Sequence, residues 1–188
     1  MKKFKFYLLC FFIFSCLGWL WEVSFNLVRV GEFINSGTLV GPWLPIYGWS
    51  GIIIVFISEK IKKNPLLIYI TSFILFGIIE YSTSLYLEEI HHLKWWDYSD
   101  NFLNINGRIW IIGLLFYALI GLIIIYCVVP IIKKIYNKLN KKTLSYILII
   151  LVLFHIVDFV YSTFNPERGA AKKTNIEIIN CKNNIKGI

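Results

Sequence analysis

Three carboxyl groups lie inside long apolar stretches of the chain, where a charge is costly. Glu22 follows the segment GWLW, Glu80 lies within the apolar run 65–87, and Asp158 lies within the run 144–164. A charged side chain at the centre of a membrane-spanning helix costs about 2.5–3.5 kcal/mol on insertion scales. Each acid must therefore be paired, protonated or hydrated, and acids retained at such positions often belong to a binding site or a proton path.

Small and polar residues recur around each acid at spacings of three or four, which places them on one face of a helix. The three sets are Ser15, Gly18, Glu22, Asn26 and Arg29; Gly77, Glu80, Thr83 and Ser84; and His155, Asp158 and Ser162. Such stripes face the inside of a membrane bundle, because lipid would leave their polar atoms without partners.

The composition indicates the elements that carry these stripes. The chain has 188 residues, of which 57% are hydrophobic, and apolar runs of about 20 residues can cross a bilayer as helices. We predict an all-α, polytopic membrane bundle of about five transmembrane helices, over about residues 6–28, 44–58, 65–87, 109–132 and 144–164. The second is the weakest, because it is short and contains prolines and glycines near its start, and it could be broken or re-entrant.

Positive residues alternate between the loops, which predicts the orientation. The richer loops and the N-terminus contain Lys2, Lys3, Lys5, Lys60, Lys62, Lys63, Lys133, Lys134, Lys138, Lys141 and Lys142, and the poorer loops contain Arg29, Lys94 and Arg108. The positive-inside rule then places the N-terminus inside and the C-terminus outside the cell membrane. The basic, apolar N-terminus lacks a cleavage site and is expected to remain as the first helix. Residues 1–165 form one predicted transmembrane domain, followed by a polar, poorly ordered tail over 166–188.

In this orientation the three acids lie at one depth. Each is roughly 20–24 Å along its helix from the inner boundary, in the outer third of a core about 30 Å thick. Arg108 begins the fourth helix at the same face. We expect Glu22, Glu80 and Asp158 to form a shared polar cluster with Arg108 and Arg29 as cations, one carboxyl being neutral or bonded to His155. For any single acid, simple bonding between helices is an equal alternative.

The loop EEIHHLKWWDYSDNFLNINGR is expected to lie over this cluster. Trp96 and Tyr98 fit an aromatic belt at the headgroup level, while Asp97 and Asn106 add polar groups beside Arg108. Anchoring at the interface is the alternative for the aromatic residues. At the start of the second helix, Tyr47 in GPWLPIYG lies at the same predicted depth.

Other chemistries are less well supported. His91 and His92 beside Glu88 and Glu89 lack a zinc-binding pattern, so we expect no metal and no cofactor. His155, Asp158 and Ser162 lie on one helical stripe, without the nucleophile elbow or oxyanion hole of a hydrolase. The four cysteines form no CxxC pair. The net charge of +8 is explained by topology rather than by nucleic acid.

The segments GWLWE, GPWLPIYGWSG, EYSTSLYLEE and WWDYSDNFLNINGRI, in this order, resemble a family of small bacterial membrane proteins described as ABC-transporter permeases, the type IV, CmpB-like group. The resemblance covers about residues 15–130, and DFVYS around Asp158 also fits. The signature positions are Gly18, Trp19, Glu22, Gly41, Pro42, Pro45, Tyr47, Gly48, Glu80, Tyr81, Trp96, Asp97, Tyr98, Asn106, Gly107 and Arg108. The resemblance implies transport, and the chain has no ATP-binding motif of its own.

The leading expectation is therefore a transport component whose acidic pocket binds a polar or cationic group, working with a separate ATPase subunit or as a homo-oligomer. Glu22, Glu80 and Asp158 would form its centre, with Arg108 as counter-ion. A membrane-embedded enzyme or binding factor for a lipid-linked envelope substrate is one alternative, in which the acids could act as acid and base. A non-catalytic envelope scaffold is another.

Overall fold

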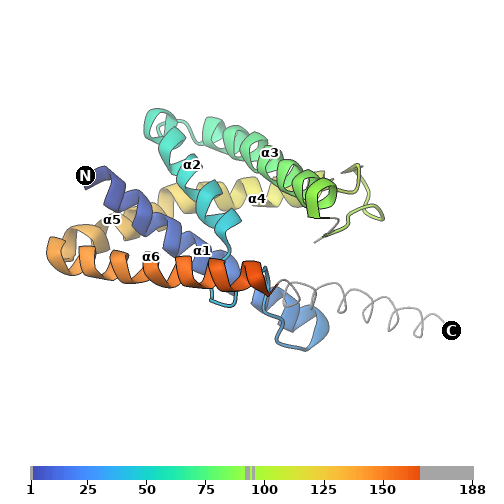
Figure 1. Ribbon diagram of the computed structural model, residues 1–188. Helices are drawn as coiled ribbons and strands as arrows, with labels where there is room; N and C mark the ends of the chain where they lie inside the picture. Colours follow the sequence, from blue (N-terminus) through green and yellow to red (C-terminus); the bar gives the residue numbers. More distant parts are fainter. Residues whose placement is uncertain (1, 92–93, 95, 166–188) are drawn as a thin grey trace. The chain divides into compact units, whose positions relative to one another are not determined.

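The computed structural model describes every residue except 1, 92–93, 95 and 166–188, and it is built almost wholly of helices (Figure 1). The helices are α1 (Lys2–Val30), α2 (Pro45–Ile61), α3 (Pro65–His91), α4 (Ile111–Ile123), the π-helix η1 (Ile124–Val128), α5 (Val129–Lys138) and α6 (Lys141–Phe164). Two short strands, β1 (Asn104–Ile105) and β2 (Ile109–Trp110), form a hairpin between α3 and α4. The all-α prediction is confirmed apart from this hairpin.

Among the described residues, four helical segments are long and apolar enough to cross a membrane. They are Lys3–Arg29, Pro65–Ile90, Ile111–Lys138 and Lys141–Phe164, and the third joins α4, η1 and α5 into one continuous rod. The remaining helix, α2, has 17 residues, or about 25 Å, which is shorter than the roughly 30 Å hydrocarbon core. It is the span that the sequence marked as weakest.

Local sequence explains where the helices begin and end. Pro45 and Pro65 open α2 and α3, at a position where a missing N–H costs nothing. Gly31 ends α1 with a φ of 77° and donates its N–H to the Leu27 carbonyl at 2.9 Å, as C-terminal glycines do. The Asn140 side chain caps α6 by accepting the Lys142 N–H at 3.0 Å.

The π-helix has an identifiable cause in Pro130. A proline within a helix lacks an N–H, and its ring crowds the carbonyl four residues earlier. Here that carbonyl belongs to Tyr126, inside the π turn Ile124–Val128, whose wider spacing accommodates the ring. The Tyr126 hydroxyl donates to the Lys62 carbonyl at 2.7 Å, which joins this part of the rod to the turn between α2 and α3.

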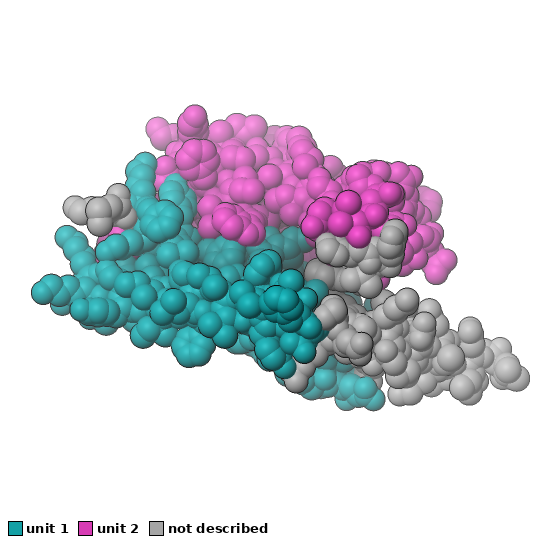
Figure 2. Space-filling model, viewed as in Figure 1, with its two compact units in different colours: residues 1–48, 140–188 teal, residues 49–139 magenta. Residues whose placement is uncertain are grey.

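The chain divides into two compact units, coloured separately in Figure 2. Unit 1 comprises residues 1–48 and 140–188, and unit 2 comprises residues 49–139. The expectation of a single transmembrane domain stays a prediction. The tail expected over 166–188 lies outside the described residues.

Unit 1 pairs α1 with α6, and the two helices run in the same direction (Figure 1). Lys5 near the start of α1 donates to Ser145 near the start of α6 at 2.6 Å. Further along, the rings of Phe11 and Phe12 contact the ring of His155. The segment 31–48 folds back against both helices, and Leu44 donates its N–H to the Ser15 carbonyl at 3.0 Å.

Unit 2 pairs α3 with α4 in antiparallel directions, and small residues allow close approach. A Cβ on Gly121 would collide with the Ser72 hydroxyl, and one on Gly77 would meet a methyl group of Leu114 at 3.0 Å. Small residues at helix contacts are the usual basis of packing in membranes, where lipid is as apolar as leucine. The predicted small-polar stripe of α3 thus contributes Gly77 to the α4 contact.

Candidate functional site

The Asp158 carboxylate on α6 is held by four donors. Its Oδ1 accepts the Val40 N–H at 2.9 Å and the Ser162 hydroxyl at 3.2 Å. Its Oδ2 accepts the Gly41 N–H at 2.8 Å and the Trp43 indole N–H at 2.7 Å. Three of the four come from the segment that precedes α2, so Asp158 fastens this segment to α6.

The sequence GPW lets the chain approach the carboxylate this closely. A Cβ on Gly41 would lie 2.5 Å from the Trp43 ring and 2.9 Å from Asp158 Oδ2. Only glycine leaves room for both neighbours at this position. Two consecutive backbone N–H groups directed at one carboxylate form a small concave anion site, which keeps Asp158 hydrogen-bonded without a basic side chain.

An open hollow of about 450 Å³ lies beside this carboxylate. Its lining combines the acid with aromatic and apolar side chains, namely Val40, Gly41, Trp43, Phe154, Val157, Asp158 and Tyr161. All of these residues belong to unit 1. The arrangement places one negative group in a largely apolar and aromatic wall.

His155 lies one turn before Asp158, among aromatic rings. Its ring centroid is 5.6 Å from that of Phe11, 5.9 Å from that of Phe12 and 5.6 Å from that of Trp43, all in edge-on arrangements. Its Nδ1 is buried and has no hydrogen-bond partner among the described residues. His155 therefore packs against the Trp43 ring, and it is not one of the hydrogen-bond donors to the Asp158 carboxylate.

Glu22 on α1 has a tyrosine partner. The Tyr47 hydroxyl donates to Glu22 Oε1 at 2.7 Å, and the Tyr47 ring lies directly over Gly18, one turn earlier on α1. On the next turn, Asn26 donates to the Ser36 hydroxyl at 2.9 Å. The predicted stripe of α1 thus faces the segment 31–48, and Glu22 is bonded to a neutral donor rather than to Arg29, which is exposed.

Glu80 on α3 is joined to the loop that follows its helix. The Tyr98 hydroxyl donates to Glu80 Oε1 at 3.2 Å, and Tyr117 of α4 lies beside them. Burial, followed by the influence of Tyr117 and Glu80, raises the pKa of the Tyr98 phenol well above its usual value near 10. Tyr98 therefore remains a protonated donor to Glu80 across the physiological range.

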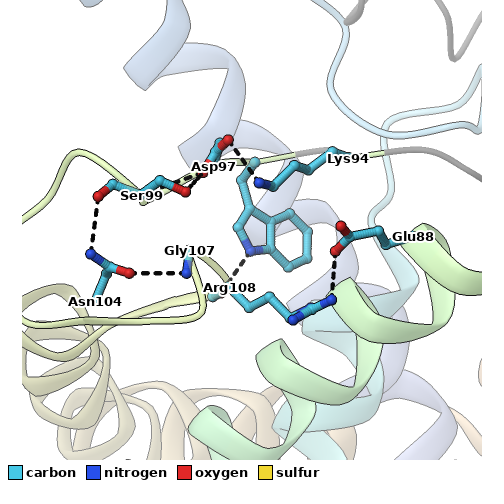
Figure 3. A network of polar contacts seen from close by, with 8 residues as sticks. Glu88, Lys94, Asp97, Ser99, Asn104, Gly107 and Arg108 are labelled. Carbon is cyan, nitrogen blue, oxygen red and sulfur yellow. Dashed lines mark hydrogen bonds and ion pairs between the residues drawn. The ribbon is translucent and has the colours of Figure 1, made fainter.

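Arg108, just before β2, pairs with Glu88 rather than with Glu80. Its guanidinium lies 2.7 Å from the Glu88 carboxylate (Figure 3) and 5.6 Å above the centre of the Tyr81 ring. Asn106 donates to the Tyr81 hydroxyl at 3.1 Å. The counter-ion that we expected in the acidic cluster thus has an acid of its own near the end of α3.

A hydrogen-bonded turn shapes the loop between α3 and α4 (Figure 3). Asp97 accepts the Ser99 N–H at 2.9 Å, the Ser99 hydroxyl at 2.6 Å and Lys94 Nζ at 2.8 Å. Burial alone would raise the pKa of Asp97, but these hydrogen bonds and the Lys94 charge lower it to about 2. Asp97 is therefore ionised, and these partners, Lys94 and Ser99, belong to the same loop.

The hairpin turn uses left-handed backbone conformations, at Asn106 (φ 53°) and Gly107 (φ 64°). The Trp96 indole N–H donates to the Arg108 carbonyl at 3.0 Å, which folds the first part of the loop over the hairpin. We did not predict this hairpin, although the Asn-Gly pair is its usual signal.

The candidate residues therefore fall into two groups. Glu22, Tyr47 and Asp158 belong to unit 1, whereas Glu80, Trp96, Asp97, Tyr98, Asn106 and Arg108 belong to unit 2. The gathering of all of them in one cluster stays a prediction. The sequence reasoning missed Trp43, Glu88 and Tyr117 as partners. Tyr117 lies within the apolar helix α4, where an aromatic residue is not recognisable as a hydrogen-bonding group. Trp43 could have been noticed, because it lies in the turn GPWLP before α2.

The long apolar helices, three of which carry small-polar stripes, define a multi-pass membrane protein. The chain belongs to the family described as "Putative ABC-transporter type IV", whose family model matches residues 9–163. The resemblance noted in the sequence is thereby confirmed, and it extends through Asp158. No curated protein and no solved structure matches the chain.

Proposed function

We propose that the protein is the membrane component of a transport system and that it binds a polar or cationic group at the hollow beside Asp158. The observation that carries this proposal is the state of the Asp158 carboxylate. It lies within the apolar helix α6 and lines the hollow, yet all four of its donors are neutral.

Neutral donors stabilise a carboxylate without cancelling its charge. No cationic side chain among the described residues contacts Asp158, so one negative charge remains at the wall of the hollow. Two opposite charges 4 Å apart attract by about 4 kcal/mol at an effective dielectric constant of about 20. A cationic group in the hollow would gain this attraction, which favours binding of a cation over binding of an anion.

The parallel course of α1 and α6 supports a five-span topology. Two membrane helices that point the same way must be separated by an odd number of crossings. Helix α3 and the rod Ile111–Lys138 supply two, so we infer that α2 supplies the third, as a short span near the lower limit of length. Together with the lysine distribution, this supports a topology with the N-terminus inside and the Asp158 end of α6 near the outer surface.

The proposal requires an energy source outside this chain. The sequence has no phosphate-binding loop, so a separate ATPase subunit would dock on inner segments. The exposed, lysine-rich end of α5, the two-residue turn after it and the start of α6, residues 133–142, offer one such surface. A homo-oligomer would enlarge a pathway that five helices form only narrowly.

The test is purification of the tagged full-length chain in a mild detergent. We expect an ATPase subunit with a phosphate-binding loop to elute with the chain and ATP hydrolysis to rise when the two are combined. As a matched pair, Asp158→Asn removes the charge of the hollow, while Ser162→Ala keeps the charge and removes one donor. Loss of substrate-dependent ATP hydrolysis in Asp158→Asn alone supports the proposal. A chain that neither binds nor stimulates an ATPase is not a transport component.

A lipid-binding role is the second candidate, and one feature of unit 2 favours it. An open, apolar groove of about 380 Å³ runs along α3 and α4 and ends at the hairpin. Phe73, Ile74 and Leu114 line one part of the groove, and Tyr81 lines another. Asn106 and Arg108 of the hairpin both contact Tyr81, so polar groups lie near this part of the groove. Such a groove fits an acyl or isoprenoid chain with a polar head. Mass spectrometry of lipids retained after gentle extraction would identify one species in stoichiometric amount if this reading holds.

A further inference from the structure

We propose that the hollow beside Asp158 takes a quaternary ammonium group, in preference to a metal ion or a primary ammonium. This inference rests on the proposed cation binding and names the class of cation. It follows from how the oxygens of Asp158 are already used and from which side chains form the rest of the wall.

The lone pairs of Asp158 are occupied. A carboxylate offers about four acceptor positions, and here each oxygen accepts two hydrogen bonds, from Val40 and Ser162 on Oδ1 and from Gly41 and Trp43 on Oδ2. A metal ion must bind an oxygen lone pair directly, at about 2.0–2.6 Å. A primary ammonium must donate hydrogen bonds to such lone pairs. Either one would have to displace one of these four donors, which we call the Asp158 clamp.

A quaternary ammonium has neither requirement. It carries its charge on a shell of methyl groups, so it needs only a negative field and surfaces that methyl groups can contact. Aromatic faces supply both contact and attraction, which is why aromatic residues recur in sites for choline-like groups. The hollow is lined by three aromatic side chains, Trp43, Phe154 and Tyr161, together with the Asp158 carboxylate.

The surrounding residues also match this ligand in size and polarity. The hollow of about 450 Å³ is ample for a tetramethylammonium-sized group. Its remaining side chains, Val40 and Val157, are apolar, so they would contact methyl groups without leaving a donor or acceptor unpaired. Among the side chains that line the hollow, a metal ion would find carboxylate oxygens only on Asp158.

The experiment measures binding of tetramethylammonium, methylammonium and sodium to the purified full-length chain in a maltoside detergent, by isothermal titration calorimetry. We expect tetramethylammonium to bind at least tenfold more tightly than either of the others. Equal or tighter binding of methylammonium or sodium would overturn the inference. Divalent cations serve as a further comparison, with the same expected order.

Two aromatic variants test the wall without touching the clamp. Phe154→Leu and Tyr161→Leu should each weaken tetramethylammonium binding by about three- to tenfold. Phe159→Leu is the matched control, because Phe159 is an exposed phenylalanine of the same helix that does not line the hollow. Equal affinities in all three variants would refute a role for the aromatic wall even if Asp158→Asn failed to fold.

Nanodiscs distinguish the two natural sources of such a group. In phosphatidylglycerol nanodiscs, tetramethylammonium should bind as it does in detergent. Weaker binding in phosphatidylcholine nanodiscs would indicate that a lipid headgroup occupies the hollow, and equal binding would indicate a free solute. Absence of binding in detergent and in both nanodiscs overturns the inference. An ATPase partner found without tetramethylammonium binding would defeat this inference and leave the transport proposal standing.

Discussion

At the scale of single residues, the intramembrane acids are accommodated in different ways. Asp158 accepts four hydrogen bonds, whereas Glu22 accepts one from Tyr47. A charge-neutral amide can imitate an acceptor but not four acceptor positions, since its nitrogen donates. The two acids should therefore respond differently to the same chemical change.

We predict that Asp158→Asn lowers stability by about 2–4 kcal/mol, because its amide nitrogen would face donors and leave them unpaired. Glu22→Gln should leave stability unchanged or raise it, because its amide oxygen can still accept from Tyr47 while the cost of a charge in the membrane disappears. Thermal unfolding in detergent compares the two variants with the original chain. Equal destabilisation of both variants would show that the four hydrogen bonds to Asp158 contribute no more to stability than the single one to Glu22.

The Tyr98 phenol provides a pH-dependent prediction. Its pKa is raised in the folded chain above the usual value near 10, so the folded state holds the proton more tightly than the unfolded state. The stabilisation is therefore complete below pH 10 and is lost as the pH rises above it. Unfolding temperatures between pH 8 and 11.5 should fall more steeply for the original chain than for Tyr98→Phe. Parallel curves would exclude this linkage.

At the scale of elements, close packing depends on which neighbour faces each small residue. Gly18 of α1 lies under the ring of Tyr47, whereas Gly77 of α3 meets only the end of the flexible Leu114 side chain. A rigid ring that is held by a hydrogen bond to Glu22 cannot move aside. A leucine methyl group can adjust by a few tenths of an ångström.

Gly18→Ala should consequently destabilise the protein by about 1–3 kcal/mol, as overpacking does. Gly77→Ala is the matched control, since it adds the same methyl group in a helix interior and should cost much less or be neutral. The unfolding temperatures of the two variants, measured in one detergent, check the difference. A larger effect of Gly77→Ala would contradict the packing described for α1 and the α2 start.

At the scale of the whole molecule, the number of membrane crossings decides where every loop lies. In the topology that we propose, the parallel pair α1 and α6 makes α2 a further crossing, although α2 has only 17 residues. If α2 crosses, the segment before it and the turn after it are on opposite sides. This consequence can be measured directly in cells.

We expect Thr38→Cys, placed in a chain without other cysteines, to react with a membrane-impermeant maleimide in intact cells. Lys63→Cys should react only after permeabilisation, because the proposed topology puts the turn between α2 and α3 inside. Both positions are exposed, so accessibility within the protein does not separate them. Labelling of both cysteines in intact cells would show that α2 re-enters without crossing.

Most of the helical architecture was predictable, because it depends on properties of neighbouring residues. Hydrophobic runs and prolines set most bounds of the helices within about four residues, although the fourth was expected to end near 132 and continues to Lys138. Spacings of three and four identified the stripes around Glu22, Glu80 and Asp158. The short hairpin at Asn106–Gly107 escaped prediction, although its signal was present.

The sequence by itself thus determined the class of protein and the long helices, since apolar periodicity is a local property. Only the tertiary structure decided which groups satisfy the acids. Asp158 is bonded to residues more than 100 positions away along the chain, and Arg108 is paired with Glu88. Such pairings depend on how a turn brings a distant segment of the chain against a helix. Every residue except proline has a backbone N–H, so the residue type does not show which N–H groups donate to a carboxylate.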